Sequence, residues 1–117
     1  MKSNNKPVQY TYGDKGDGVT WRNYAGQYHR IDGPAIENED GSYYYFLNGS
    51  RHREDGPACI DKHGSVEYWQ NGLIHRIGGP AIIRSAPNIE NYYVNGKCVF
   101  KEEHDTLFNM MKLKGLI

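Results

Sequence analysis

The sequence contains no segment that would place the protein in a membrane. No apolar run in its 117 residues approaches the roughly 20 residues of a transmembrane helix. The N-terminal stretch MKSNNKPVQY also lacks the apolar run of a signal peptide. Lys plus Arg equals Asp plus Glu, at 14 each, so no net charge attracts nucleic acid or an anionic membrane. We therefore expect a soluble cytoplasmic protein with no membrane contact and no sequence-specific nucleic-acid binding.

Cysteine is also scarce. The two cysteines, Cys59 and Cys98, are too few for a disulfide framework, so we expect reduced thiols. Cys59 occupies the position that Ile36 and Ile82 occupy in related stretches of the chain. This equivalence predicts that Cys59 is a small buried hydrophobic residue rather than a reactive thiol.

Sequence patterns typical of active sites are missing as well. The chain has no Gly-x-Ser-x-Gly motif, no carboxylate dyad, no cysteine pair and no glycine-rich phosphate loop. We therefore expect a protein that is not an enzyme, with no catalytic residues, no metal and no cofactor.

Tyrosine and glycine are abundant, at 10 and 14 residues, whereas aliphatic residues are few. The length suits one domain with one modest core. That core must be largely aromatic, and the scaffold around it must be rich in turns.

A seven-residue motif, His-Arg-x-x-Gly-Pro-Ala, occurs three times. The copies span residues 29–35, 52–58 and 75–81, so the spacing is 23 residues both times. Glycines at 18, 26, 33, 41, 49, 56, 64, 72 and 79 add a turn every seven or eight residues. This regularity predicts a repeat protein.

The segments between these turns are too short for helices. SYYYFL, SVEYWQ and ENYYVN are rich in aromatic and β-branched residues, which favour strands. Asp-Gly and Asn-Gly steps favour two-residue hairpin turns, with positive φ expected at Gly49 and Gly72. We expect a mainly β fold, a repeat sheet of stacked hairpins over residues 8–100 after a flexible tail at 1–7. A triangular β-solenoid with three strands per 23-residue coil is the alternative.

The motif copies and the preceding Tyr/Trp-x-x-Asn-Gly pattern resemble the MORN-type repeat, in the divergent variety found in phage and bacteria. The resemblance covers roughly residues 8 to 100, although the third copy reads HRIGGPA and a fourth has Val99-Phe100 in place of His-Arg. It implies an extended antiparallel sheet that takes part in protein contacts, lipid contacts or assembly. Some bacterial variants are antitoxin-like, and the resemblance implies no shared catalytic centre.

The three histidines do not suit a shared metal site. If each repeat is a hairpin, equivalent positions lie roughly 9 to 10 Å apart, whereas zinc binds imidazole nitrogen at about 2.0 to 2.1 Å. We instead expect structural roles for the motif. His29 and His52 would bond to a turn backbone, and the arginines would form the pairs Arg30–Asp32 and Arg53–Asp55.

Arg76 differs because Gly78 stands where its acidic partner should be. The third copy therefore carries unmatched positive charge near a group of aromatic residues. We expect this end of the chain to bind a partner while Arg76 contributes little to stability. The predicted partner-binding residues are Arg76, Arg84, Tyr68, Trp69, Tyr92, Tyr93 and His75.

After Phe100 the pattern changes to helical spacing. KEEHDTLFNMMKLKG begins with acidic residues and ends with lysines, which suits the helix dipole. Leu107, Phe108, Met110 and Met111 fall on one side. We expect a helix over about 101–114, within a C-terminal segment 101–117 that caps the last repeat. The alternative is an exposed Met-rich stripe that docks a partner.

Two functions remain open at this point. The first is a protein-binding module, namely a small phage accessory protein that binds and inhibits a host or defence-system component in the host cytoplasm. The second is sequestration of a small anionic ligand such as a signalling nucleotide, with aromatics stacking on the base and Arg holding phosphate.

Overall fold

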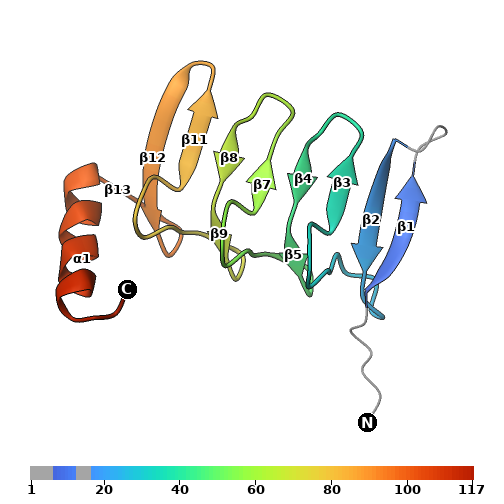
Figure 1. Cartoon of the computed structure of the whole chain (residues 1–117), viewed down its shortest axis with the longest axis horizontal. Coiled ribbons are helices and arrows are strands. Elements are labelled where there is room, and N and C mark those ends of the chain that lie inside the picture. Colours follow the sequence, from blue (N-terminus) through green and yellow to red (C-terminus); the bar gives the residue numbers. More distant parts are fainter. Residues whose placement is uncertain (1–6, 13–16) are drawn as a thin grey trace, which may run out of the picture.

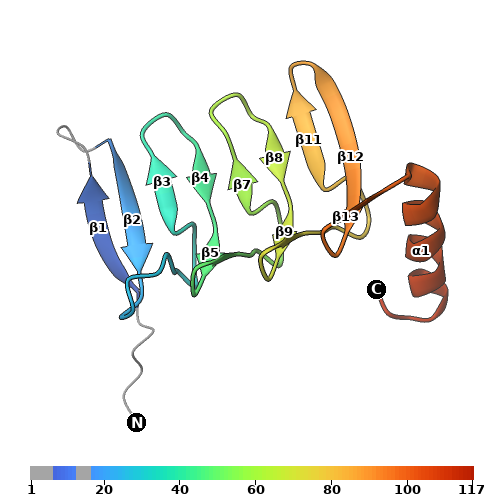
Figure 2. The ribbon, with the colours of Figure 1, turned by 180° about the vertical axis from the view of Figure 1, so that it is seen from behind.

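The computed structural model describes residues 7–12 and 17–117. The predicted flexible tail, residues 1–7, lies outside this part of the chain except for Pro7. The molecule is flat, with principal extents of 47 × 43 × 18 Å, and its hairpins lie side by side (Figure 1). The turned view shows the same row of hairpins, with the helix at the far end from β1 (Figure 2).

The chain is mainly β, as predicted, and most of its strands form one antiparallel sheet. Its nine strands lie in the order β1-β2-β3-β4-β7-β8-β11-β12-β13. They are β1 (Val8–Tyr12), β2 (Gly18–Arg22), β3 (Ile36–Asn38), β4 (Tyr43–Tyr44), β7 (Cys59–Ile60), β8 (Val66–Glu67), β11 (Ile82–Ser85), β12 (Asn88–Val94) and β13 (Lys97–Val99).

Every strand pair in the described residues is antiparallel. A β-solenoid would instead stack equivalent strands of successive coils in parallel. The solenoid alternative is therefore wrong for this chain.

Two small hairpins lie at the strand ends of the sheet, where β4 leads into one and β8 into the other (Figure 1). They pair β5 (Phe46–Leu47) with β6 (Ser50–Arg51), and β9 (Trp69–Gln70) with β10 (Leu73–Ile74). The first turns at Asn48 and Gly49, whose φ angles of 48° and 84° correspond to a type I′ turn. The positive φ predicted for Gly49 and Gly72 is confirmed, at 84° and 82°.

The segment SYYYFL does not form one uninterrupted strand. It divides at Tyr45, where the chain passes from the large sheet into the small hairpin. Tyr45 N–H donates to the Ala58 carbonyl at 2.7 Å, and the Tyr45 carbonyl accepts from His52 N–H at 3.1 Å. The backbone stays extended there, but its hydrogen-bonding neighbour changes. SVEYWQ divides in the same way at Tyr68.

The turn expected at Asp17-Gly18 is wrong. Gly18 is the first residue of β2 and is aligned with Tyr12 on one side and Asn38 on the other. It has two strand neighbours because β2 lies inside the sheet, and its position in the glycine series does not require a turn.

Small buried residues lie where three strands of the sheet begin. The three motif alanines, Ala35, Ala58 and Ala81, directly precede β3, β7 and β11 and have no exposed surface. Cys59 is 5% exposed, so its predicted burial is confirmed, and that burial raises the pKa of its thiol to about 12. The chain is thus held together by backbone hydrogen bonds and half-buried aromatic rings around a thin row of small side chains.

The predicted C-terminal helix is present as α1 (Lys101–Leu113). It begins after Phe100, whose N–H donates to the Glu103 carboxylate at 3.2 Å, and Lys101 pairs with Asp105 at 2.7 Å. Of the part of the chain that is described, no helix is long and apolar enough to cross a membrane.

Candidate functional site

The three motif arginines have the same setting on one surface of the sheet. The guanidinium carbon of each lies over an aromatic ring, which is a favourable cation–π geometry. Arg30 lies over Trp21 at 4.2 Å, Arg53 over Tyr45 at 4.2 Å, and Arg76 over Tyr68 at 3.9 Å. We call this surface the arginine face.

The Gly-Pro step of each motif completes the arginine site. The Nη1 atom of each arginine donates to the carbonyl of the motif proline four residues later, at 3.1 to 3.2 Å. A Cβ atom at Gly33 or Gly79 would lie 2.8 Å from the guanidinium carbon of Arg30 or Arg76. Glycine is needed there because the arginine lies against the backbone.

The motif histidines link each copy to the turn that follows it. The backbone N–H of Asn48, Asn71 and Asn95 donates to Nδ1 of His29, His52 and His75 respectively, each at 2.9 Å. The predicted turn contact is thus present, although the turn lies 19 or 20 residues further along the chain. Because Nδ1 accepts, the ring proton is on Nε2.

The first two copies supply carboxylates to their own basic side chains. The predicted pairs are present, with Arg30 Nε bonded to Asp32 at 3.2 Å and Arg53 Nε bonded to Asp55 at 3.0 Å. Sequence reasoning missed a further pair in the second copy, between His52 Nε2 and Glu54 at 3.0 Å. The signal was the Glu at the third place of HRED.

The third copy supplies neither carboxylate, because Ile77 and Gly78 occupy the positions of Glu54 and Asp55. No carboxylate in the described residues pairs with Arg76. Arg76 nevertheless makes structural contacts that the sequence did not predict. Its stacking on Tyr68 and its bond to the Pro80 carbonyl match those of the other motif arginines.

The helix explains why Gly78 replaces an aspartate. Gly78 has φ of 109°, a region that L side chains rarely adopt, and its N–H donates to His104 Nε2 at 3.0 Å. A Cβ there would lie 3.7 Å from the Phe108 ring, an ordinary van der Waals distance. The positive φ of the backbone that bonds to His104 is therefore what favours glycine at this position.

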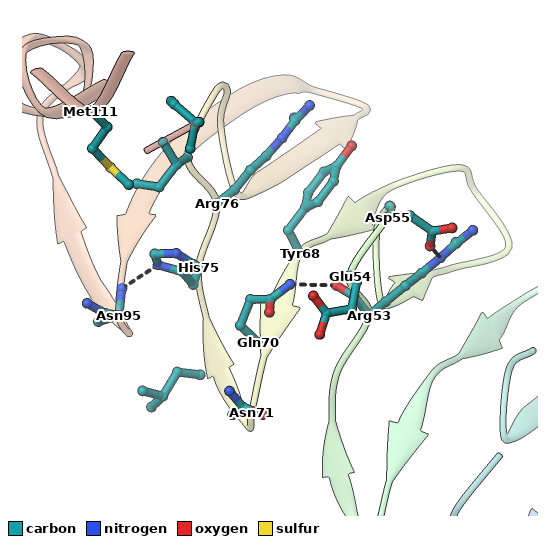
Figure 3. Close-up of a pocket in the computed structure, with 14 residues that line it drawn as sticks. Arg53, Glu54, Asp55, Tyr68, Gln70, Asn71, His75, Arg76, Asn95 and Met111 are labelled. Carbon is teal, nitrogen blue, oxygen red and sulfur yellow. Dashed lines mark hydrogen bonds and ion pairs between the residues drawn. The ribbon is translucent and has the colours of Figure 1, made fainter. Parts of the chain in front are cut away.

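Two hollows lie next to each other on the arginine face. The larger, of about 690 Å³, is lined by Arg53, Tyr68, His75 and Arg76, with Met111 of the helix on one side (Figure 3). We call it the C-terminal hollow. The second, of about 500 Å³, is lined by the residues 23 positions earlier, among them Arg30 and Tyr45. Arg53, Glu54 and Asp55 line both.

Burial lowers the pKa of His75 in the C-terminal hollow. The neutral ring is therefore favoured, which agrees with an Nδ1 atom that accepts from the Asn95 N–H. At neutral pH the hollow thus offers a neutral Nε2–H donor beside the Arg76 cation.

The structure does not bring all the predicted partner-binding residues together. Tyr68, His75 and Arg76 line the C-terminal hollow, but Arg84 lines two other depressions. Arg84 and Glu67 line one of these depressions together. The Glu67 side chain points away from that of Tyr68, because neighbouring side chains in a strand point to opposite faces. We call that surface the opposite face.

The remaining aromatics of the predicted site do not line the C-terminal hollow. The Trp69 indole N–H donates to Glu67 at 2.9 Å, so Trp69 belongs to the opposite face. The Tyr92 ring lies 4.9 Å from the buried His104 ring, beneath the helix. The Tyr93 carbonyl accepts from the Arg76 N–H at 3.2 Å. The prediction that these residues form one continuous patch is therefore wrong.

The described residues contain no group of three His, Cys, Asp or Glu side chains placed to hold a metal ion. Comparison with protein-family models, with curated proteins and with solved structures finds no match to this chain.

Proposed function

We propose that this chain is a non-enzymatic protein-binding module that uses its arginine face for contact. The observation that carries the proposal is the fixed placement of Arg30, Arg53 and Arg76 over aromatic rings beside two adjacent hollows. Arginine and tyrosine dominate the energetics of protein interfaces.

The immobilised arginines favour binding for an entropic reason. Ordering a free arginine on binding costs about 0.5–1.5 kcal/mol. Here each guanidinium is already held by a ring and by a proline carbonyl, as in the contacts of Arg53 with Tyr45 and Pro57. A partner therefore meets donors whose directions are set before contact.

We also propose that the chain is built of stacked 23-residue hairpin units of the MORN type. The support is the 23-residue spacing of the motifs in the sequence, together with the three His–Asn and three Arg–Pro contacts that recur with it. On this basis we propose that the chain is a small phage accessory protein. Its partner would be a host or defence-system protein, which it binds and inhibits.

A second candidate function is sequestration of a small anionic ligand such as a signalling nucleotide. The observation that favours it is Arg76, which lines a hollow of about 690 Å³ without a carboxylate partner in the described residues. Hollows of about 300–1,000 Å³ suit small molecules. Arg76 itself covers one face of Tyr68, which limits base stacking there.

Capture from a bacterial lysate tests the first function. Immobilised parent chain is compared with Glu54→Lys, which reverses an 82%-exposed charge between the two hollows, and with Arg84→Glu on the opposite face. We expect one protein to be captured stoichiometrically and equally by the parent and by Arg84→Glu, and its captured amount to change with Glu54→Lys.

Equal capture by all three chains would move the contact surface away from the arginine face. Thermal stabilisation of the parent by nucleotides, without any captured protein, would instead favour the second function. Circular dichroism melts of both variants show whether the fold is kept.

A further inference from the structure

The second and third motif copies differ at two positions near the C-terminal hollow, which Glu54, Asp55 and Ile77 line. In the second copy, Glu54 accepts from His52 Nε2 and Asp55 accepts from Arg53 Nε, both at 3.0 Å. In the third copy these two positions hold Ile77 and Gly78.

Two donors of the third copy consequently lack the acceptors that their counterparts in the second copy have. His29 Nε2 of the first copy, where Ile31 stands in place of Glu54, has no partner in the described residues either. His75 Nε2 carries a proton, because Nδ1 accepts from Asn95, yet no acceptor for it is found in the described chain. Arg76 Nε also lacks one there, although its Nη1 atom is bonded to the Pro80 carbonyl. Both residues line the same hollow (Figure 3).

We propose that the C-terminal hollow binds a pair of adjacent acidic residues from a segment of a partner protein. The partner's two carboxylates take the places that Glu54 and Asp55 take in the second copy, one at His75 Nε2 and one at Arg76 Nε. This inference rests on the proposed protein-binding function and specifies the chemistry of the partner.

One cation at the hollow has no carboxylate partner in the described residues. Arg53 is matched by Asp55, whereas Arg76 has no such partner, and Glu54 accepts from the neutral His52 ring and keeps its own negative charge at the hollow. Charge-assisted hydrogen bonds to carboxylate are roughly twice as strong as neutral ones.

Apolar residues also line the hollow. They are Leu73, Ile77, Met111 and Ile117, the last two from the C-terminal segment, and the amides Gln70, Asn71 and Asn95 complete the lining. Methionine adapts its shape to irregular surfaces. A segment that carries an acidic pair next to an apolar residue therefore suits the hollow better than a free phosphate or a dicarboxylate does.

The proposal is tested by NMR titration of the ¹⁵N-labelled full chain with the peptide Ac-Leu-Gly-Glu-Asp-Gly-Pro-NH₂. We expect the Arg76 Nε–H and His75 Nε2–H signals to shift and saturate. The Arg53 Nε–H signal should not shift, because this group already donates to Asp55. The same peptide with Gln-Asn in place of Glu-Asp should bind at least about tenfold more weakly, the equivalent of ~1.4 kcal/mol.

Ile77→Glu is the matched variant, because it restores within the chain the carboxylate that Glu54 supplies to His52. We expect Ile77→Glu to keep the parent melting temperature and to lose peptide binding about tenfold or more. Arg76→Lys should also weaken binding, since lysine keeps the charge but lacks the Nε–H.

Three results would overturn the proposal. They are equal binding of the Gln-Asn peptide, full binding by Ile77→Glu, and shifts of the Arg76 signal with a nucleotide or inorganic phosphate but not with the peptide. Shifts that grow with the concentration of the chain alone would assign the hollow to a second copy. Capture of one protein by the parent from the lysate, without binding of the acidic peptide, would keep the proposed function and overturn the acidic-pair site alone.

Discussion

His104 of the C-terminal helix accepts a hydrogen bond from the Gly78 N–H at 3.0 Å, across 26 residues of sequence. The same ring lies 4.9 Å from the ring of Tyr92, and the side chain is 2% exposed. Tyr92 lies three residues before its Asn-Gly turn, as Tyr45 and Tyr68 lie before theirs. A motif arginine covers the rings of Tyr45 and Tyr68. His104 thus covers the last ring of the series, where the chain has Phe100 in place of the arginine.

The first prediction concerns this contact. His104→Ala should lower the free energy of unfolding by about 1–3 kcal/mol, because it removes a buried ring and leaves the Gly78 N–H without its acceptor. His104→Phe keeps a ring but no acceptor, so it should lie between the parent and His104→Ala. Urea denaturation and amide exchange at Gly78 measure the effect. Met110→Ala, at a side chain that is 47% exposed, is the control and should change little.

The second prediction concerns Arg76 and Gly79. Gly79→Ala should cost about 1 kcal/mol or more, since its Cβ would lie 2.8 Å from the Arg76 guanidinium. In the Arg76→Ala background the same substitution should cost much less, which gives a coupling energy of about 0.5–3 kcal/mol in a double-mutant cycle. Additive effects would mean that the arginine does not lie against the glycine. Arg76→Ala and Arg53→Ala should destabilise by similar amounts, because their contacts are the same.

The third prediction concerns the two thiols. Cys98 is exposed, whereas burial raises the pKa of Cys59 to about 12. The thiolate is the reactive form, so Cys59 should resist a thiol reagent in the native chain. We expect one fast-reacting thiol in buffer and two in denaturant, counted by absorbance. Cys98→Ser should leave no fast-reacting thiol in buffer. A fast reaction of that variant would contradict the burial of Cys59.

The fourth prediction concerns acid stability. Burial lowers the pKa of His75 below its ordinary value of 6.5, so the folded chain favours the neutral ring. The resulting stabilisation is fully present above pH 6.5 and is lost as the pH falls below that value, because the unfolded chain binds the proton more readily. His75→Asn should therefore show a shallower loss of stability than the parent between about pH 7 and pH 5 in urea denaturation. Identical slopes would mean that His75 does not contribute to the acid response.

Much of the local structure could be predicted from the sequence because it depends on neighbouring residues. The type I′ turn at Asn48-Gly49 follows from two residues that tolerate positive φ. The Arg30–Asp32 and Arg53–Asp55 pairs join residues two positions apart, so the motif itself predicts them. The helix over Lys101–Leu113 follows from its charge order and its apolar spacing.

The sequence by itself also determined where the motif repeats and where it departs from its own pattern, at Ile77 and Gly78. It could not determine what the departure means. We predicted from Gly78 that Arg76 contributes little to stability and is free for a partner, whereas the structure shows that the Gly78 N–H also bonds to His104 of the helix. That contact depends on the direction in which the helix leaves the sheet after Phe100, and no local preference sets that direction.

The tertiary structure alone decided which side chains share a surface. Tyr68 and Trp69 are neighbours in the sequence, but successive side chains of an extended strand point to opposite faces. Tyr68 therefore joins Arg76 in the C-terminal hollow, while Trp69 bonds to Glu67 on the opposite face. The motif predicts which residues recur, and the pleat of the strands together with the docking of the helix decides which of them can meet one partner.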